Sequence, residues 1–226
     1  MHIEPGLVAD SKIWLSYVTA AGAAGVTAKL AWDAVKTRGP VSLLARSAAT
    51  TALVFTFFEV LPHYPVGVSE VHLIFGATLF LMFGPAPAAI GLALGLLTQG
   101  LFFAPFDLPQ YGMNVTTLLV PLLLVGTIAR RIIPEKIAYK DVKYSQCLAL
   151  STAYQGGVVA WVAFWAFYGQ GLGAETLANV GTFGLAYMSV IIIEPLLDLA
   201  VLGAAKGLHQ VHYSKVFHER LYRAAA

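Results

Sequence analysis

Long apolar runs separated by short polar connections dominate this chain. The runs lie near residues 13–35, 41–61, 68–84, 86–104, 114–130, 145–169 and 178–204. Each comes close to the roughly 20 apolar residues that cross a bilayer as a helix. Gly84-Pro85-Ala86-Pro87 separates the third run from the fourth, because proline cannot continue a helix interior. The pattern predicts an all-α membrane protein with about seven transmembrane helices.

The positions of the basic residues predict the orientation of these helices. The connections 62–67, 105–113 and 170–177 contain no Lys or Arg. The other connections and the tail are basic, through Lys36, Arg38, Arg46, Arg130, Arg131, Lys136, Lys140, Lys143, Lys206, Lys215, Arg220 and Arg223. Because basic residues mark the cytoplasmic side, seven spans place the N-terminus outside and the C-terminus in the cytoplasm.

Composition supports a single transmembrane domain over residues 1–226. The chain is 58% hydrophobic with a mean hydropathy of +0.73, and only 12% of its residues are charged, against roughly 25% in soluble domains. We expect residues 205–226 to form a cytoplasmic tail helix. The start of the chain has no signal-peptide pattern, so we expect it to be retained. Cys147 is the single cysteine, which excludes an intrachain disulfide.

The first two residues are an unusual set of metal ligands. Methionine is removed before small residues, so Met1 should stay in front of His2. The Met1 amine, the deprotonated His2 amide and the His2 Nδ1 can then close two fused chelate rings at three corners of a square. Square-planar nitrogen sites favour Ni(II) or Cu(II). We therefore interpret residues 1–12 as a metal-binding segment; a chance histidine at a frayed terminus is the alternative.

Two histidines on the outer side can supply a fourth ligand. His72 lies near the outer end of the third run, and an ionisable side chain within a span is a functional candidate. The alternative for His72 is a hydrogen bond to a neighbouring helix. His63 lies between Pro62 and Tyr64 in a connection, where solvation is the simpler interpretation. The other histidines, His209, His212 and His218, are in the tail.

Several of these residues together resemble a known family. The start Met-His-Ile-x-x-Gly, the segment His-Leu-x-x-Gly at His72 and the following Gly-Pro turn resemble the CbiM/NikM family. These proteins are the substrate-binding membrane subunits of nickel and cobalt energy-coupling-factor transporters. The matching run extends from Val71 to Val125, and Gln99 and Asn114 occupy the places of a Gln and an Asn in that family.

The resemblance implies a ligand set inside a seven-helix bundle. The N-terminus would tuck into the bundle, where the Met1 amine, the His2 amide and imidazole and an imidazole of the third span hold the metal. His72 matches that imidazole. Gln99 and Asn114 would orient the ligands by hydrogen bonds, or else simply hold helices together.

The resemblance also implies a function. The chain would capture Ni(II) or Co(II), as the transported substrate, in the lipid bilayer of a prokaryotic plasma (inner) membrane. Its partners would be a transmembrane coupling subunit and two ATPase subunits. A small accessory membrane subunit is a further candidate partner. The sequence has no Walker motif and no nucleophile–base pattern, so we expect no enzyme activity. We expect no nucleic-acid partner.

Departures from the family pattern leave a second interpretation open. Glu4-Pro5 has the reverse of the usual order, and Val71 stands where the family has a small residue. A membrane subunit that binds metal without transport, or a scaffold or assembly subunit of a larger membrane complex, is therefore the alternative. The sequence does not choose between nickel and cobalt, and copper is chemically plausible.

Some residues keep two interpretations each. Glu59 and Glu70, near the outer mouth, attract cations or are solvated. Glu194 and Asp198 interrupt the last run and mark either an ion path or a kink at Pro195. The spacing of Ala20, Ala24 and Ala28 resembles the face on which the family docks its coupling subunit, and it equally suits packing within the chain.

Overall fold

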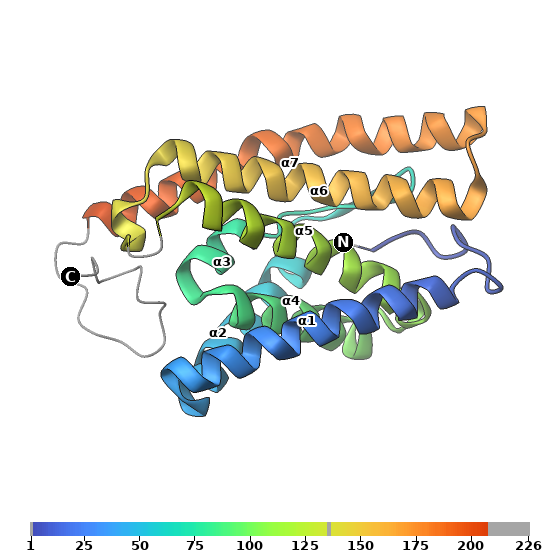
Figure 1. The fold of residues 1–226 in the computed structure, drawn as a ribbon. Coiled ribbons are helices and arrows are strands. Elements are labelled where there is room, and N and C mark those ends of the chain that lie inside the picture. Colours follow the sequence, from blue (N-terminus) through green and yellow to red (C-terminus); the bar gives the residue numbers. More distant parts are fainter. Residues whose placement is uncertain (1, 135–136, 208–226) are drawn as a thin grey trace.

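Helices account for most of the structure, as the apolar runs predict (Figure 1). The computed structural model describes residues 2–134 and 137–207. Those residues form α1 (Trp14–Arg38), α2 (Pro40–Glu59), α3 (Gly76–Phe83), α4 (Pro85–Phe102), α5 (Tyr111–Ile132), α6 (Tyr144–Gln170) and α7 (Ala174–Gly207). They also form two 3-10 helices, η1 (Pro105–Gln110) and η2 (Tyr139–Asp141), and strands β1 (Tyr64–Val66) and β2 (Ser69–Val71).

Among the described residues, five helical segments are long and apolar enough to cross a membrane. They are α2, α4, the continuous stretch of η1 and α5, α6 and α7. The chain is therefore a multi-pass, all-α membrane protein. The helix α1 is also long, but Lys29, Asp33, Lys36 and Arg38 fall in its last turns. Of the predicted tail helix, residues 205–207 belong to α7, and 208–226 lie outside the described residues.

The prediction of one continuous span over 68–84 was wrong. Its helical part, α3, has eight residues and a length of about 12 Å, against roughly 30 Å of hydrocarbon. The preceding residues form an antiparallel hairpin in which Val66 pairs with Ser69. Gly67 has φ 62° at the first central position of that two-residue turn, where glycine is favoured. Non-helical backbone occurs in membrane proteins where surrounding protein satisfies its polar groups.

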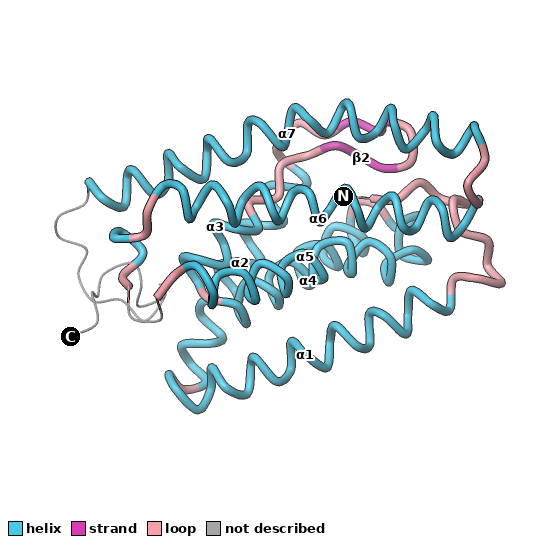
Figure 2. The backbone as a smooth tube through the Cα atoms, turned by 45° about the horizontal axis from the view of Figure 1, so that its top comes forward, coloured by secondary structure: helices cyan, strands magenta, loops and turns pink. Residues whose placement is uncertain are grey.

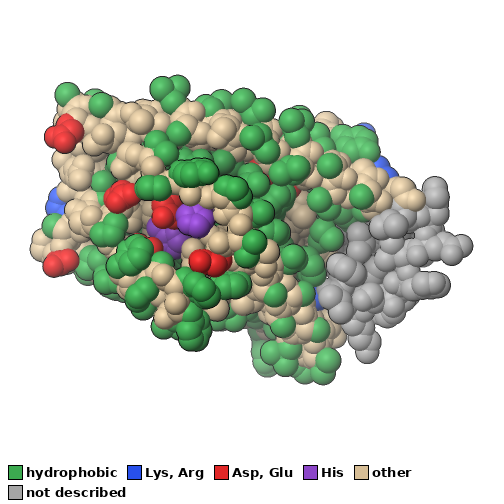
Figure 3. All heavy atoms as spheres, turned by 180° about the vertical axis from the view of Figure 1, so that it is seen from behind, with side chains coloured by type: hydrophobic (Ala, Val, Ile, Leu, Met, Phe, Trp, Pro, Cys, Tyr) green, Lys and Arg blue, Asp and Glu red, His purple; other side chains and the backbone are tan. Residues whose placement is uncertain are grey.

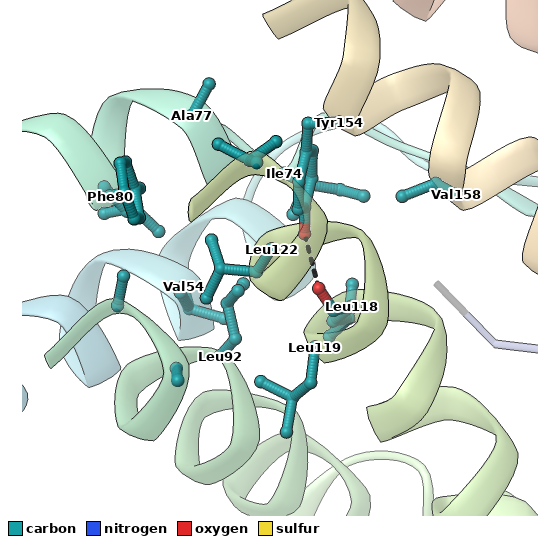
Figure 4. Packing of buried hydrophobic residues seen from close by; sticks show 14 of the residues in the cluster. Val54, Ile74, Ala77, Phe80, Leu92, Leu118, Leu119, Leu122, Tyr154 and Val158 are labelled. Carbon is teal, nitrogen blue, oxygen red and sulfur yellow. Dashed lines mark hydrogen bonds between the residues drawn. The ribbon is translucent and has the colours of Figure 1, made fainter. Parts of the chain in front are cut away.

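The hairpin packs against α7, with Tyr64 and Pro65 of β1 exposed and Ser69 of β2 buried. Figure 2 shows both strands running beneath α7. The helices α2 and α4 pack together, as do α5, α6 and α7 in sequence. Figure 4 shows the apolar core where these groups meet, with Tyr154 of α6 donating its hydroxyl to the backbone oxygen of Leu118 at 3.3 Å.

The two ends of the bundle differ in chemistry. The α1–α2 turn, the α5–α6 connection and the end of α7, which carry most of the basic residues of the connections, lie at one end (Figure 1). The N-terminal segment, the hairpin turn, η1 and the α6–α7 turn lie at the other end. The basic connections therefore share one end of the bundle.

Candidate metal site

The N-terminal segment is built into the fold next to the hairpin. Residues 2–4 lie antiparallel to β2, where Ile3 bridges Ser69. The Glu70 amide donates to the His2 backbone oxygen at 3.0 Å, and so does the Ser69 hydroxyl, also at 3.0 Å. These bonds fix the backbone of His2 relative to the strand that leads to His72.

Contacts with the helices hold the same segment from its other side. The Ile3 amide donates to Asn114 Oδ1 of α5 at 2.8 Å. Ile3, Leu7 and Val8 are buried in the hydrophobic core. The Lys12 ammonium donates to the backbone oxygen of Tyr168, at the end of α6, at 3.1 Å. The segment is thus seated in the bundle, and Asn114 contacts the residue next to His2.

Three side chains converge where this segment meets the hairpin. His2, Glu70 and His72 each offer a ligand atom, and these atoms lie within 4.8 Å of one another. The His2 Nδ1 is 2.6 Å from Glu70 Oε2, and the two imidazole centroids are 6.3 Å apart. His2 is 4% exposed and His72 is 2% exposed. In Figure 3, histidine side chains lie beside acidic ones on one face.

His72 occupies an extended segment rather than a helix. It follows β2 and precedes α3, and the Phe58 ring lies edge-on to its imidazole with centroids 4.6 Å apart. The His72 Nε2 is buried and has no hydrogen-bond partner among the described residues. The His72 Nδ1 lies 3.4 Å from the backbone oxygen of Leu73 in its own segment, so the predicted alternative, a hydrogen bond from the imidazole to a neighbouring helix, is not observed among the described residues.

The protonation of this cluster suits a cation. Burial lowers the pKa of the His2 imidazole, and the Glu70 hydrogen bond offsets only part of that effect. Burial alone would raise the pKa of Glu70, but the hydrogen bond with His2 and nearby positive charge bring it below its ordinary value. Asp107 Oδ2 lies 3.7 Å from the His2 Nε2. A neutral imidazole beside carboxylates is the state from which metal ions bind.

The remaining predicted residues lie at different distances from the cluster. Gln99 donates to the backbone oxygen of Phe58 and to Glu59 Oε2, both at 3.3 Å, so it contacts the backbone of the residue whose ring packs against His72. His63 Nδ1 is 3.2 Å from the Leu61 backbone oxygen, outside the three-residue group. Met1 lies outside the described residues.

Sequence reasoning missed the partnership of Glu70 with His2. Residues two apart in an extended segment project to the same face, and this applies to Glu70 and His72. The helical interpretation of residues 68–84 concealed that signal. The contact of Asp107 with His2 depends on η1 meeting the N-terminal segment, and no local pattern indicated it.

The donor set suits late first-row transition metals. Imidazole nitrogens are typical ligands of nickel, copper and zinc, whereas magnesium and calcium prefer all-oxygen sites. The Glu70 carboxylate is already hydrogen-bonded to the His2 Nδ1. A metal binding at that nitrogen must therefore displace the carboxylate or share it.

Known proteins resemble this chain in family pattern and in fold. The family model described as CbiM, cobalt uptake substrate-specific transmembrane region, matches residues 2–210. A crystal structure of a transition metal transporter aligns with a TM-score of 0.70 at 18% identity, covering 94% of this chain and 95% of that one. A truncated transition metal transporter aligns with a TM-score of 0.65 at 17% identity, covering 92% and 97%. A search of curated proteins gave no match.

Proposed function

The chain belongs to the CbiM family of cobalt uptake substrate-specific transmembrane regions, and from this premise we propose that it captures Ni(II) or Co(II) for import. As a transporter membrane component it is not an enzyme. The ion would be held by the Met1 amine, the His2 amide nitrogen, the His2 Nδ1 and the His72 imidazole. Asn114 and Gln99 would orient these ligands.

One observation carries this proposal: the fold brings His2 and His72 together in a buried place. The two residues are 70 positions apart in the chain, yet their ligand atoms lie within 4.8 Å of each other. The hydrogen bonds of Asn114 and of β2 hold the His2 backbone with that geometry. Burying an imidazole nitrogen without a hydrogen-bond partner costs free energy, and a bound metal ion removes that cost.

The membrane arrangement of the proposal follows the charge pattern. Seven crossings would place the N-terminus and the metal site outside a prokaryotic plasma membrane and the basic end in the cytoplasm. ATP hydrolysis would be carried out by two ATPase subunits, acting through a transmembrane coupling subunit. Ala24 and Ala28 of α1 are exposed, which supports docking of that coupling subunit on α1.

Metal binding by the purified chain tests the proposal. We expect Ni(II) and Co(II) to bind with a stoichiometry of one, in titration calorimetry or competition with a coloured chelator, and Mg(II) and Ca(II) to produce no signal. Uptake of labelled metal into cells that also make the coupling and ATPase subunits separates transport from simple metal holding. A chain that binds neither Ni(II) nor Co(II) would refute the proposal.

Glu70 should contribute to affinity whether it binds the ion directly or through His2. Replacing it by glutamine keeps the shape and removes a negative charge beside a divalent cation. Outer partners of metal ligands are worth about 10–100-fold in affinity, so Glu70→Gln should weaken binding of both metals by that order. Asp107→Asn is the matched control, since Asp107 is outside the three-residue group, and its effect should be smaller. The reverse ranking would contradict the role given to Glu70.

A further inference from the structure

Two carboxylates of α7 are buried inside the bundle. Glu194 and Asp198 are both 0% exposed and lie one helical turn apart. Burying an acid among apolar helices is costly, so such groups are kept where they have specific partners. Metal binding as proposed above does not use either of them.

Two partners of Glu194 belong to the segment that carries His72. Glu194 Oε2 accepts a hydrogen bond from the Ile74 amide at 2.6 Å. Its other oxygen, Oε1, accepts from the Phe75 amide at 2.8 Å and from the Gln155 side chain of α6. One side chain of α7 therefore holds the backbone immediately after His72.

That segment cannot satisfy its own amides. Residues 72–75 belong neither to β2 nor to α3, and the first amides of a helix have no acceptor within it. Phe75 has φ 59°, in the left-handed region that bulky residues rarely adopt. Next to it, a Cβ on Gly76 would collide with the ring of Tyr154, so the backbone lies directly against that ring. Such a conformation needs an external anchor, and Glu194 provides it.

From these contacts we propose that Glu194 is a positioning residue for metal capture: its carboxylate fixes the segment 72–75 so that the His72 imidazole faces His2. This inference rests on the proposed function of the site. Asp198 has a different task, because it accepts from the Thr78 hydroxyl within α3 and does not bind the segment. The His2 side of the site is held by α5 and the His72 side by α7.

The test compares Glu194→Gln with Asp198→Asn, each in the full chain purified in lipid nanodiscs. A glutamine has one acceptor oxygen and places an amide group where the carboxylate met a donor, so it cannot hold both backbone amides. We expect Glu194→Gln to weaken Ni(II) and Co(II) binding by about 10–100-fold, the range for residues that orient metal ligands. The ligand-field absorption of bound Ni(II) should shift as well. Asp198→Asn should keep affinity and spectrum, even if both variants melt at a lower temperature.

If the Glu194→Gln protein fails to fold, a second variant still tests the inference. Glu194→Asp keeps the charge but shortens the reach, and it should weaken binding with the same spectral shift. A folded Glu194 variant with unchanged affinity and spectrum would overturn the inference. So would an equal loss of affinity in Asp198→Asn. If the unmodified protein binds neither metal, the proposed function itself fails, which is a distinguishable result.

Discussion

Adding two alanines ahead of Met1 should lower the Ni(II) affinity of this protein by more than about 100-fold. The extension converts the proposed amine ligand into an amide and moves the free amine out of the chelate rings formed with His2, whereas a single added residue would place a new amine where it can chelate together with the His2 Nδ1. Residues that only orient metal ligands are worth about 10–100-fold, so loss of a ligand and of its chelate ring should exceed that range. Competition with a coloured chelator measures the change directly.

The control for this experiment is two alanines added after Ala226. That addition lies in the tail and should leave the affinity unchanged. Intact-mass measurement must establish that the N-terminal extension is present on the purified chain. Tight binding that persists in a verified N-terminal extension would show that the terminal amine is not a ligand, and the capture mechanism would have to be rebuilt on His2, Glu70 and His72 alone.

The long helices were predictable because lipid requires a simple pattern. A segment such as 178–204 must be apolar over its whole length and must satisfy its backbone internally, and both conditions are visible in one stretch of sequence. The structure places α7 over Ala174–Gly207. The same reasoning failed at 68–84, because hydropathy sums do not register that Ser69, Glu70 and the amides of Ile74 and Phe75 find partners from distant parts of the chain.

Some residues of the candidate site were recognisable from the local sequence, whereas the roles of others depend on contacts with distant residues. His2 and His72 were recognisable from residue type and position, and the structure brings them together. Asn114 accepts a hydrogen bond from the Ile3 amide, and the expectation that it orients the metal ligands stays a prediction. Glu194 was noticed in the sequence but could not be assigned, because its partners at Ile74 and Phe75 are about 120 residues away. Only the packing of α7 against the bundle shows what it holds.

Replacing His72 by alanine should also lower the affinity for Ni(II) and Co(II) by more than about 100-fold, since it removes a ligand rather than an orienting group. The buried His72 Nε2 has no hydrogen-bond partner in the described part of the chain, so the substitution breaks no bond at that nitrogen. A cavity next to Phe58 is the structural cost. Affinity measured by chelator competition, alongside the melting temperature without metal, separates the two effects.

His63→Ala is the matched control, because His63 is the other histidine on the same side of the predicted topology and lies outside the cluster. It should keep the affinity and the ligand-field spectrum of the unmodified protein. If His63→Ala lost binding while His72→Ala kept it, the fourth ligand would have been assigned to the wrong imidazole. Equal and partial losses in both variants would indicate an electrostatic contribution from each histidine rather than direct coordination by His72, because an ion bound through His72 cannot lose that ligand and keep most of its affinity.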